Sequence, residues 1–376
     1  MLRFFFLLSI CFANTGIAQE LVDATLNHDG LTREYLIYIP VNYNEESQVP
    51  LMFNFHGYGD NAENYMEYAD MRPMADEDGF LLVYPQGSLD NEGAPFWNVE
   101  GPSTTKTVDD IGFVEAMMDA MIENYAVDES RIYACGFSNG GFITFDLACR
   151  INERLAAVAT VASTMMGDSY DECTLDHPTP VILIHGTLDF IVPLAGVLPY
   201  LLPIDTVNSF WADANNTDAS PVITEVIDSE NTGGSPVNIY EWANGDACSV
   251  IRYYQVVDGG HDWPGGWGAS LIDAEQEIWD FCSQFDLTGL IGCTNDVTEI
   301  NKSKVVCYPN PTSETIVFQS KIAGVEIGTV QVYNNLGVQV GALHNTLSGK
   351  EYDVSFLSSG VYVLRTKQGT LNLVKI

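Results

Sequence analysis

Short apolar runs alternate with amphipathic stretches over the chain as far as residue 285. The apolar runs are bounded by turn residues and predict buried strands, whereas apolar positions spaced three and four residues apart predict helices. Because strands and helices alternate, we expect an α/β fold that is doubly wound around a mostly parallel sheet. The predicted strands are 35–39, 51–55, 80–84, 131–135, 181–185, 222–227 and 251–257, and the predicted helices are 111–125 (N-cap Asp109 or Asp110), 140–150 and 274–285.

The last part of the chain has a different pattern. It opens with the turn-rich sequence Tyr308-Pro309-Asn310-Pro311, and turn signals recur at 334–337 and 358–360. Short alternating strands at close spacing predict a small all-β sandwich, which we expect as a C-terminal module. The alternating segments are 315–319, 330–333 and 361–365.

Charge divides the chain at the same place. The whole chain holds 15 Lys and Arg against 51 Asp and Glu, a formal net charge of −36, yet residues 301–376 alone carry a net +3. The acidic field of the first part repels phosphate backbones and anionic lipid surfaces, so we expect no nucleic-acid partner. Two segments of such different charge predict two folding units. The expected division is a domain at 19–298, a linker at 299–307 and the β module at 308–376.

The N-terminus has the three parts of a secretory signal peptide. Arg3 supplies the positive charge, residues 4–12 are apolar, and Gly16-Ile17-Ala18 offers small residues before a cleavage site. We therefore expect residues 1–18 to be removed and the protein to be secreted, extracellular or at the cell surface. The apolar run is too short to span a bilayer, and no later run reaches about 18 apolar residues, so we expect no membrane span.

Cysteine usage fits an oxidising compartment. After removal of Cys11 with the signal, and with Cys135 expected as a buried thiol, six cysteines remain. The short loops Cys149–Cys173 and Cys282–Cys293 are the preferred disulfides, although spacing alone leaves other pairings open. There is no Cys-x-x-Cys pair, and the acidic turns at 76–79 and 213–218 lack EF-hand spacing. We therefore expect neither a metal nor another cofactor.

A candidate nucleophile lies between a predicted strand and a predicted helix. Gly136-Phe137-Ser138-Asn139-Gly140 reads G-x-S-x-G, and it follows the strand at 131–135 directly. A sharp strand-to-helix turn at this motif exposes the serine hydroxyl, and the helix N-terminus offers N–H groups to a developing oxyanion. The pattern alone is frequent by chance, but its strand–turn–helix context makes Ser138 the expected nucleophile.

The general base and its acid follow from chain order. In α/β-hydrolases the triad runs Ser, acid, His, and among the six histidines only His261 and His344 lie suitably downstream of Ser138. His344 falls in the β module, so His261, in a Gly-rich loop after an apolar strand, is the expected base. Asp189 lies just past the strand that ends at His185, at the sheet edge where functional loops gather, and is the expected acid. His185 itself is expected to be a packed structural histidine.

Two backbone donors are expected to form the oxyanion hole. One is the Asn139 N–H, directly after the nucleophile, and the other is the Tyr58 N–H in the loop H-G-Y-G at 56–59. Aromatic residues are expected around the cleft as well. We expect Trp97 and Trp263 to bind substrate there, although either ring could equally belong to the core.

The combined motifs resemble a known family. H-G-Y-G at 56–59, V-D-D-I-G-F at 108–113, G-F-S-N-G-G at 136–141, H-G-T-L-D at 185–189 and G-G-H-D-W-P-G at 259–265 occur together in order. They are similar to the polyhydroxybutyrate depolymerase-like esterases, relatives of the feruloyl and acetylxylan esterases of carbohydrate esterase family 1. The resemblance covers about residues 25–285 and implies an α/β-hydrolase fold with the triad Ser138, Asp189 and His261.

The C-terminal module resembles the type IX secretion sorting domain. Y-P-N-P-T at 308–312, V-Y-N-N-L-G at 332–337 and L-S-S-G-V-Y-V-L-R at 357–365 carry this likeness. The resemblance implies export across an outer membrane, with the type IX secretion machinery as partner.

We expect the protein to be a secreted enzyme that hydrolyses an ester substrate through an acyl-enzyme. The substrate is expected to be a polymer or an oligomer. The first hypothesis is a polyester such as polyhydroxybutyrate. The alternative is a feruloyl or acetylated plant polysaccharide, and a less favoured one is a non-catalytic secreted binding protein.

Overall fold

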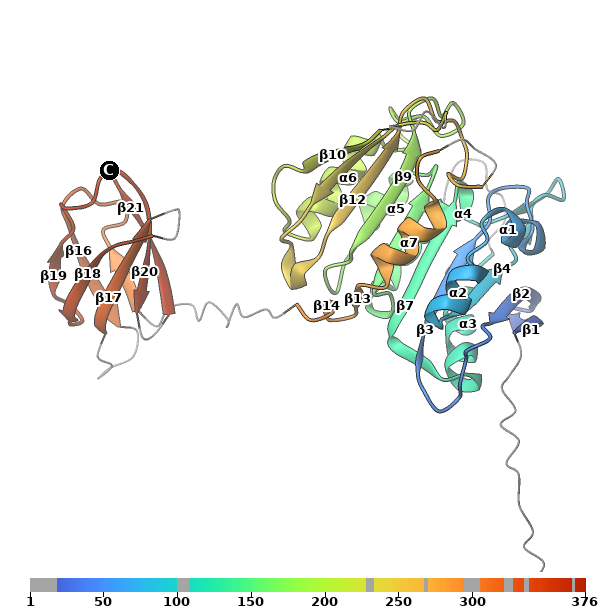
Figure 1. Ribbon diagram of the computed structural model, residues 1–376, viewed down its shortest axis with the longest axis horizontal. Coiled ribbons are helices and arrows are strands. Elements are labelled where there is room, and N and C mark those ends of the chain that lie inside the picture. Colours follow the sequence, from blue (N-terminus) through green and yellow to red (C-terminus); the bar gives the residue numbers. More distant parts are fainter. Residues whose placement is uncertain are drawn as a thin grey trace, which may run out of the picture. The chain divides into compact units, whose positions relative to one another are not determined.

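The computed structural model describes residues 19–99, 108–227, 233–266, 270–293, 305–320, 327–334, 338–366 and 369–376. The chain divides into two compact units, Met1–Cys293 and Thr294–Ile376 (Figure 1). The predicted signal peptide at 1–18 and most of the predicted linker lie outside the described residues. The expected end of the signal peptide at 18 and the expected start of the linker at 299 stay predictions.

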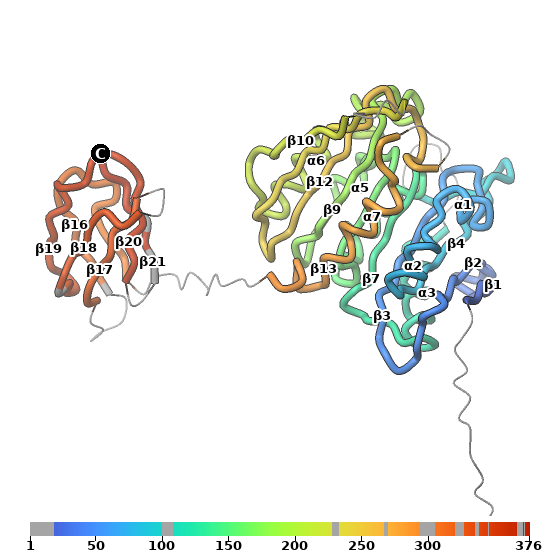
Figure 2. Tube along the Cα trace, viewed as in Figure 1, coloured from blue at the N-terminus to red at the C-terminus, as the bar shows by residue number. Residues whose placement is uncertain are grey.

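A ten-stranded sheet forms the centre of the first unit, in the order β1-β2-β4-β3-β7-β8-β9-β12-β11-β10. The six strands from β4 to β12 in that order are parallel to their neighbours, and antiparallel pairs extend the sheet at both edges. Figure 2 shows β9 beside β12, although some 65 residues separate them in the chain. The strands are β1 (Glu20–His28), β2 (Leu31–Ile39), β3 (Val49–Phe55), β4 (Leu81–Pro85), β7 (Val127–Phe137), β8 (Ala157–Val161), β9 (Val181–Gly186), β10 (Val222–Val226), β11 (Val237–Trp242) and β12 (Ile251–Val256).

Helices cover both faces of this sheet, as doubly wound topology requires. Apolar side chains of α3, α4 and α6 join the buried cluster on one face, and those of α1, α2 and α7 join the cluster on the other. Figure 1 shows α2 and α7 in front of the sheet. The helices are α1 (Ala62–Tyr68), α2 (Arg72–Asp78), α3 (Asp110–Asn124), α4 (Asn139–Arg150), α5 (Gly167–Glu172), α6 (Ile204–Ala214) and α7 (Ala274–Cys282), with short 3₁₀ turns at Asn152–Arg154 and Asp246–Cys248. Small two-stranded ribbons are β5 (Ser88–Leu89) with β6 (Pro95–Phe96) and β13 (Phe285–Asp286) with β14 (Gly289–Leu290).

The mostly parallel α/β sheet predicted from the pattern is confirmed. β4, β8 and β9 are buried along their whole length, as central parallel strands are. Asp109 is the N-cap of α3, where its carboxylate accepts the Gly112 N–H at 2.9 Å. The pattern did not reveal β1, β8 or β11. β8 was missed because its Ala-Val-Ala-Thr-Val sequence is short and has neither strand nor helix periodicity.

The second unit is a pair of antiparallel sheets around its own core. The sheet orders are β15-β16-β19 and β18-β17-β20-β21, and Phe318 from one sheet and Leu364 from the other belong to one buried cluster. The strands are β15 (Val305–Tyr308), β16 (Thr315–Ser320), β17 (Gly328–Asn334), β18 (Gln339–Thr346), β19 (Glu351–Asp353), β20 (Gly360–Thr366) and β21 (Gly369–Lys375). The predicted linker at 299–307 is too long, because Val305 is already buried and paired with β16.

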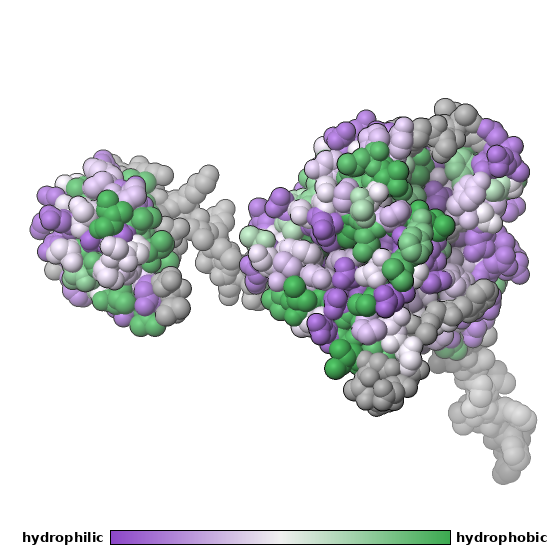
Figure 3. All heavy atoms as spheres, turned by 90° about the horizontal axis from the view of Figure 1, so that it is seen from above, coloured by the Kyte–Doolittle hydropathy of each residue, from purple (hydrophilic) through white to green (hydrophobic). Residues whose placement is uncertain are grey.

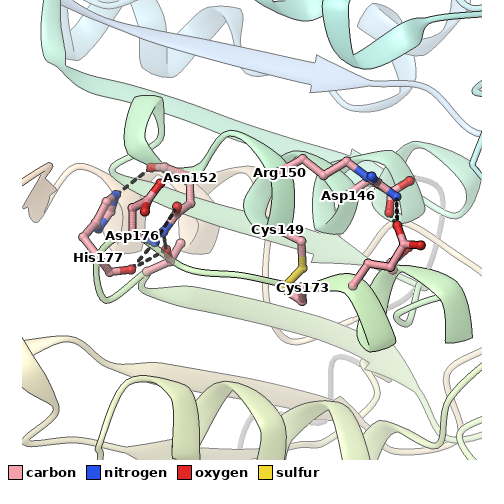
Figure 4. The surroundings of a disulfide bond; sticks show 10 residues. Asp146, Cys149, Arg150, Asn152, Cys173, Asp176 and His177 are labelled. Atoms are coloured by element: carbon pink, nitrogen blue, oxygen red, sulfur yellow. Dashed lines mark hydrogen bonds and ion pairs between the residues drawn. A yellow bond between two sulfur atoms is a disulfide. The ribbon is translucent and has the colours of Figure 1, made fainter.

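Two disulfides close loops in the first unit. The predicted Cys149–Cys173 bond is present and ties α4 to the end of α5. Figure 4 shows its surroundings, where hydrogen bonds between Asn152 and the segment at 176–177 hold the same loop. The predicted Cys282–Cys293 bond is wrong, since Cys293 pairs with Cys248. Cys282 is a free thiol that packs in the buried cluster of the sheet face covered by α7.

Removal of the Cys149–Cys173 bond should destabilise the first unit. The two cysteines are 24 residues apart in the sequence. A disulfide that closes a loop of this length restricts the unfolded chain and stabilises the fold by about 3 kcal/mol. We expect the double variant Cys149→Ala/Cys173→Ala to lose about this much free energy of unfolding, measured by urea titration. An unchanged urea midpoint would show that the hydrogen bonds around Asn152 hold the loop without the disulfide.

Candidate active site

Ser138 occupies the turn between β7 and α4. Its backbone angles are φ 53° and ψ −117°, a strained conformation for a residue with a side chain. Two neighbouring glycines make the turn possible. A Cβ at Gly136 would collide with the Gly140 carbonyl, and one at Gly140 would collide with the Phe55 carbonyl. The G-x-S-x-G spacing therefore permits the close backbone approach that lifts the serine side chain off the sheet.

His261 connects Ser138 to Asp189. Its Nε2 lies 2.9 Å from Ser138 Oγ, and its Nδ1 lies 2.7 Å from Asp189 Oδ2. Because a carboxylate only accepts, Nδ1 carries the proton and Nε2 is free to accept the serine proton. The three residues come from the ends of β7, β9 and β12, which share the carboxyl edge of the parallel sheet. The arrangement is that of a nucleophile, a general base and an orienting acid.

Asp189 is buried and accepts several hydrogen bonds. Its Oδ1 accepts the N–H groups of Ile191 at 2.9 Å and Val192 at 2.8 Å, and its Oδ2 faces two histidines. Burial opposes ionisation, but the hydrogen bonds from His185, His261 and the Val192 N–H outweigh it and hold the Asp189 pKa well below its usual range. Asp189 is therefore a fixed negative charge beside His261 at any physiological pH.

His185 is a structural histidine, as the sequence predicted. It is buried, and its Nε2 lies 2.8 Å from the Val192 carbonyl and 3.1 Å from Asp189 Oδ2. It therefore helps to fix Asp189 Oδ2, the same oxygen that faces His261. Sequence reasoning missed this contact, although the i, i+4 spacing of His185 and Asp189 was a signal for it.

The two predicted oxyanion donors lie beside the nucleophile. Asn139 is the first residue of α4, so its N–H has no partner within the helix. The Tyr58 N–H has no hydrogen-bond partner within the described residues. A Cβ on the preceding Gly57 would meet the Phe137 ring at 3.0 Å, which places this loop against the residue before Ser138. Whether the two N–H groups bind an oxyanion remains a proposal.

Trp97 does not line a cleft, in contrast to the prediction. Its side chain is completely buried, so the ring has no surface to offer a substrate. It bridges the two oxyanion segments instead. The indole N–H donates to the His56 carbonyl at 2.9 Å, and the Asn139 side chain accepts the Trp97 N–H at 2.7 Å and donates to its carbonyl at 3.1 Å. Trp97 therefore fixes the position of the loop at 56–59 relative to the N-terminus of α4.

Trp97→Phe should lower the turnover rate. The change leaves the buried His56 carbonyl without its donor and loosens the loop that carries the Tyr58 N–H. We expect kcat for a soluble ester to fall by about tenfold with little change in KM. This fall corresponds to a loss of about 1.4 kcal/mol of transition-state stabilisation. Trp211→Phe is the matched control, since Trp211 is equally buried and its indole N–H has no partner within the described residues. Equal effects of the two variants would contradict the bridging role.

Trp263 is also buried rather than exposed to substrate. Its backbone N–H donates to Tyr68 Oη at 2.8 Å, and its ring packs edge-on against Tyr65. It supports the loop of His261 from within the core, and the prediction of substrate contact is wrong for this residue as well. Exposed aromatic side chains at the site are Phe190, next to Asp189, with 83% of its surface accessible, and Tyr58 in the loop at 56–59, with 57%.

Within the part of the chain that the structure describes, no group of three or more His, Cys, Asp or Glu side chains could hold a metal ion. No helix among the described residues is long and apolar enough to cross a membrane.

Two family models match the chain. Residues 33–178 match the model described as esterase PHB depolymerase, and residues 306–376 match the model described as secretion system C-terminal sorting domain. The first match contains Ser138 but ends before Asp189 and His261.

Known proteins resemble the first unit. A bifunctional acetylxylan esterase/xylanase of Neocallimastix patriciarum is 25% identical over 71% of this chain, and feruloyl esterase B of Piromyces equi is 27% identical over 68%. The chain spans only 35% and 46% of the length of these two relatives. Among solved structures, an acetyl xylan esterase from Aspergillus awamori shares the fold, with a TM-score of 0.50 and 15% identity over 70% of this chain and 99% of that one.

The sheet order and the likeness to the acetyl xylan esterase structure define the class of fold of the first unit, which is the α/β-hydrolase fold. More particularly, residues 33–178 are similar to the esterase PHB depolymerase family and residues 306–376 to secretion system C-terminal sorting domains. The match at 306–376 supports a location outside the cell or at its surface.

Proposed function

We propose that the protein hydrolyses esters through an acyl-enzyme on Ser138. The hydrogen-bond chain from Ser138 through His261 to Asp189 carries this proposal. Ser138 Oγ attacks the ester carbonyl while His261 Nε2 takes its proton, and Asp189 stabilises the imidazolium. The Tyr58 and Asn139 N–H groups bind the oxyanion, helped by the positive end of α4. His261 then gives the proton to the departing alcohol.

Water completes the reaction by the same steps. His261 Nε2 takes a proton from water, the resulting hydroxide attacks the acyl carbon, and the acid leaves as Ser138 recovers its proton. Only Ser138 and His261 exchange protons in these steps, and Asp189 orients the imidazole. The carboxylate of Asp189 stays ionised throughout, because its pKa lies well below its usual range.

The proposed substrate is a polyester such as polyhydroxybutyrate. The description of the matching family model supports this choice, as does the exposed apolar surface beside Asp189. The alternative is a feruloyl or acetyl ester on plant polysaccharide, which the names of the relatives support. We further propose the type IX secretion machinery as the partner of the C-terminal module, on the description of its family model.

Two measurements test the proposed function. A fluorophosphonate probe should label Ser138 covalently, and failure to label it would favour a non-catalytic binding protein. Acid release should then be compared between a polyhydroxybutyrate suspension and methyl ferulate, with Ser138→Ala as the blank. Faster release from ferulate would reverse the order of the two substrate hypotheses.

A further inference from the structure

His56 is a completely buried polar side chain at the end of β3, and the triad does not use it. It follows Phe55, the last residue of β3, and comes two residues before Tyr58. The hydrophilic side chains at the surface of the protein, which Figure 3 shows from above, face solvent, whereas the His56 imidazole meets only protein. Buried polar groups need hydrogen-bond partners inside the protein, so the partners of the two ring nitrogens show what this side chain does.

Two donors determine which ring nitrogen of His56 carries the proton. The Gly87 backbone N–H donates to His56 Nε2 at 2.9 Å, and the side-chain nitrogen of Gln86 lies 3.3 Å from the same atom. The Gln86 amide is held in this orientation because its oxygen accepts the Ala62 N–H at 3.0 Å. Nε2 is therefore an acceptor, and the neutral ring carries its proton on Nδ1. Burial lowers the pKa of His56 below its ordinary value, so the ring is neutral at physiological pH.

The Nδ1 proton holds one peptide plane of the predicted oxyanion loop. Nδ1 donates to the Gly57 carbonyl at 2.7 Å, whereas the Asp60 N–H reaches the same carbonyl only at 3.3 Å. The peptide bond between Gly57 and Tyr58 is trans, so its C=O and N–H groups point in opposite directions. A Gly57 carbonyl that is held toward the imidazole therefore turns the Tyr58 N–H away from the ring. That N–H has no hydrogen-bond partner within the described residues.

Packing holds the imidazole in place. A Cβ at Gly87 would lie 3.1 Å from His56 Cε1, so the ring lies directly against this glycine. The Trp97 ring packs against the imidazole with 5.1 Å between the ring centroids, and its indole N–H donates to the His56 carbonyl at 2.9 Å. The ring and the main chain of His56 are thus held by separate contacts. The direction of the peptide plane is therefore set before a substrate binds, as preorganised stabilisation of an oxyanion requires.

From these contacts we propose that His56 is a positioning residue for the oxyanion hole. Its neutral imidazole, protonated on Nδ1, holds the Gly57 carbonyl and thereby aims the Tyr58 N–H at the carbonyl oxygen of the ester. His56 itself neither contacts the substrate nor exchanges a proton with it. This inference rests on the proposed function, in which the Tyr58 and Asn139 N–H groups bind the oxyanion, and it identifies the group that orients the first of them.

Two variants that each keep one half of the imidazole's hydrogen bonding test this role. Asparagine carries an amide nitrogen at the position of Nδ1, so His56→Asn can still donate to the Gly57 carbonyl but offers no acceptor to the Gly87 N–H. Glutamine carries its amide at the position of Nε2, so His56→Gln can still accept the Gly87 N–H but offers no donor to the Gly57 carbonyl. Each variant loses one hydrogen bond at the same buried position. Each is therefore the control for the structural cost of the other.

The two variants should differ in turnover rather than in substrate binding. We expect kcat on p-nitrophenyl butyrate to fall by at least about tenfold in His56→Gln and by less than about threefold in His56→Asn, with little change in KM in either. Rates are expressed per active site titrated with a fluorophosphonate probe, so unfolded protein is not counted as slow enzyme. Equal losses of kcat in the two variants, or losses that simply follow the melting temperature, would overturn the positioning role.

A tetrahedral inhibitor gives a second measure of the oxyanion hole. Ser138 Oγ adds to the carbonyl carbon of a trifluoromethyl ketone, its proton passes to His261, and the ketone oxygen becomes an oxyanion. We expect the inhibitor to bind His56→Gln at least about tenfold more weakly than the wild type, and His56→Asn within about threefold of it. Unchanged binding to His56→Gln would contradict an effect on the oxyanion donor.

The wild-type protein alone decides the question if neither variant folds. ¹H–¹⁵N NMR of the full chain at pH 7 should show the His56 proton on Nδ1 and none on Nε2, with the ring identified by its proximity to Trp97. A proton on Nε2, or on both nitrogens, would overturn the proposal. A wild-type protein that is inactive on p-nitrophenyl butyrate would instead overturn the proposed function, and the protonation of His56 could still be measured in it.

Discussion

Ser138→Ala should abolish ester hydrolysis, lowering kcat by at least about 10⁴-fold, because no other group at the turn can replace the serine oxygen. His261 Nε2 would lose the proton donor that lies 2.9 Å away, and no acyl-enzyme could form. The fold should survive, since alanine tolerates the φ of 53° no worse than serine does. The measurement is kcat on p-nitrophenyl butyrate, with the melting temperature recorded for the same preparation.

Ser163→Ala is the matched control for this variant. Ser163 is buried and packs against Gly141, which lies on the first turn of α4. The Ser163 hydroxyl has no hydrogen-bond partner within the described residues. Its loss should change kcat by less than about threefold, a difference below 1 kcal/mol. Residual turnover of more than a few per cent in Ser138→Ala would show that the acyl-enzyme mechanism is wrong.

Asp189→Asn should lower kcat by about 10⁴-fold while leaving the loop in place. The amide oxygen can still accept the Ile191 and Val192 N–H groups, but the amide NH₂ would face His261 Nδ1. Nδ1 of His261 would then accept a hydrogen bond from the amide, and the ring proton would lie on Nε2. A protonated Nε2 cannot take the proton of Ser138. Asp258→Asn, at an exposed turn after β12, makes the same chemical change without touching the triad.

The stability that Asp189→Asn loses relative to the wild type should be larger at neutral pH than in acid. The pKa of Asp189 is lower in the folded protein than in the unfolded chain, so the folded state gains from its ionised form. That contribution is complete above the unfolded pKa of about 4 and disappears as pH falls through the lower folded pKa. Urea titrations should therefore show that the variant's free energy of unfolding falls furthest below that of the wild type above about pH 5. The difference should shrink in strong acid. A deficit that grows with acidity would contradict the hydrogen-bonded carboxylate.

Local signals in the sequence were enough to predict the fold class and the central residues of the site. Buried strands such as β9 appear as continuous apolar runs, and α3 begins at an N-cap carboxylate, because both effects act within a few residues. Ser138 was found from glycine spacing, since the elbow imposes its steric demand on its own neighbours. Chain order then selected Asp189 and His261, and the structure brings all three together. Their catalytic roles stay a proposal.

What the sequence did not reveal depends on contacts between distant segments. An aromatic ring has the same local pattern whether it faces a cleft or the core, so Trp97 and Trp263 could be placed only by packing. Disulfide pairing is equally nonlocal, and Cys248 rather than Cys282 meets Cys293 because α7 turns its thiol into the core. The exposure of Phe190 likewise depends on how distant segments pack, so the local sequence could not reveal it.

The sequence by itself therefore determined the α/β class, and it predicted two units and the three candidate triad residues, since turn sterics, periodicity and chain order are written in neighbouring residues. The tertiary structure alone decided which aromatic side chains are buried and which cysteines pair. Burial is a property of the whole assembled core, and no short stretch of sequence specifies what will cover it.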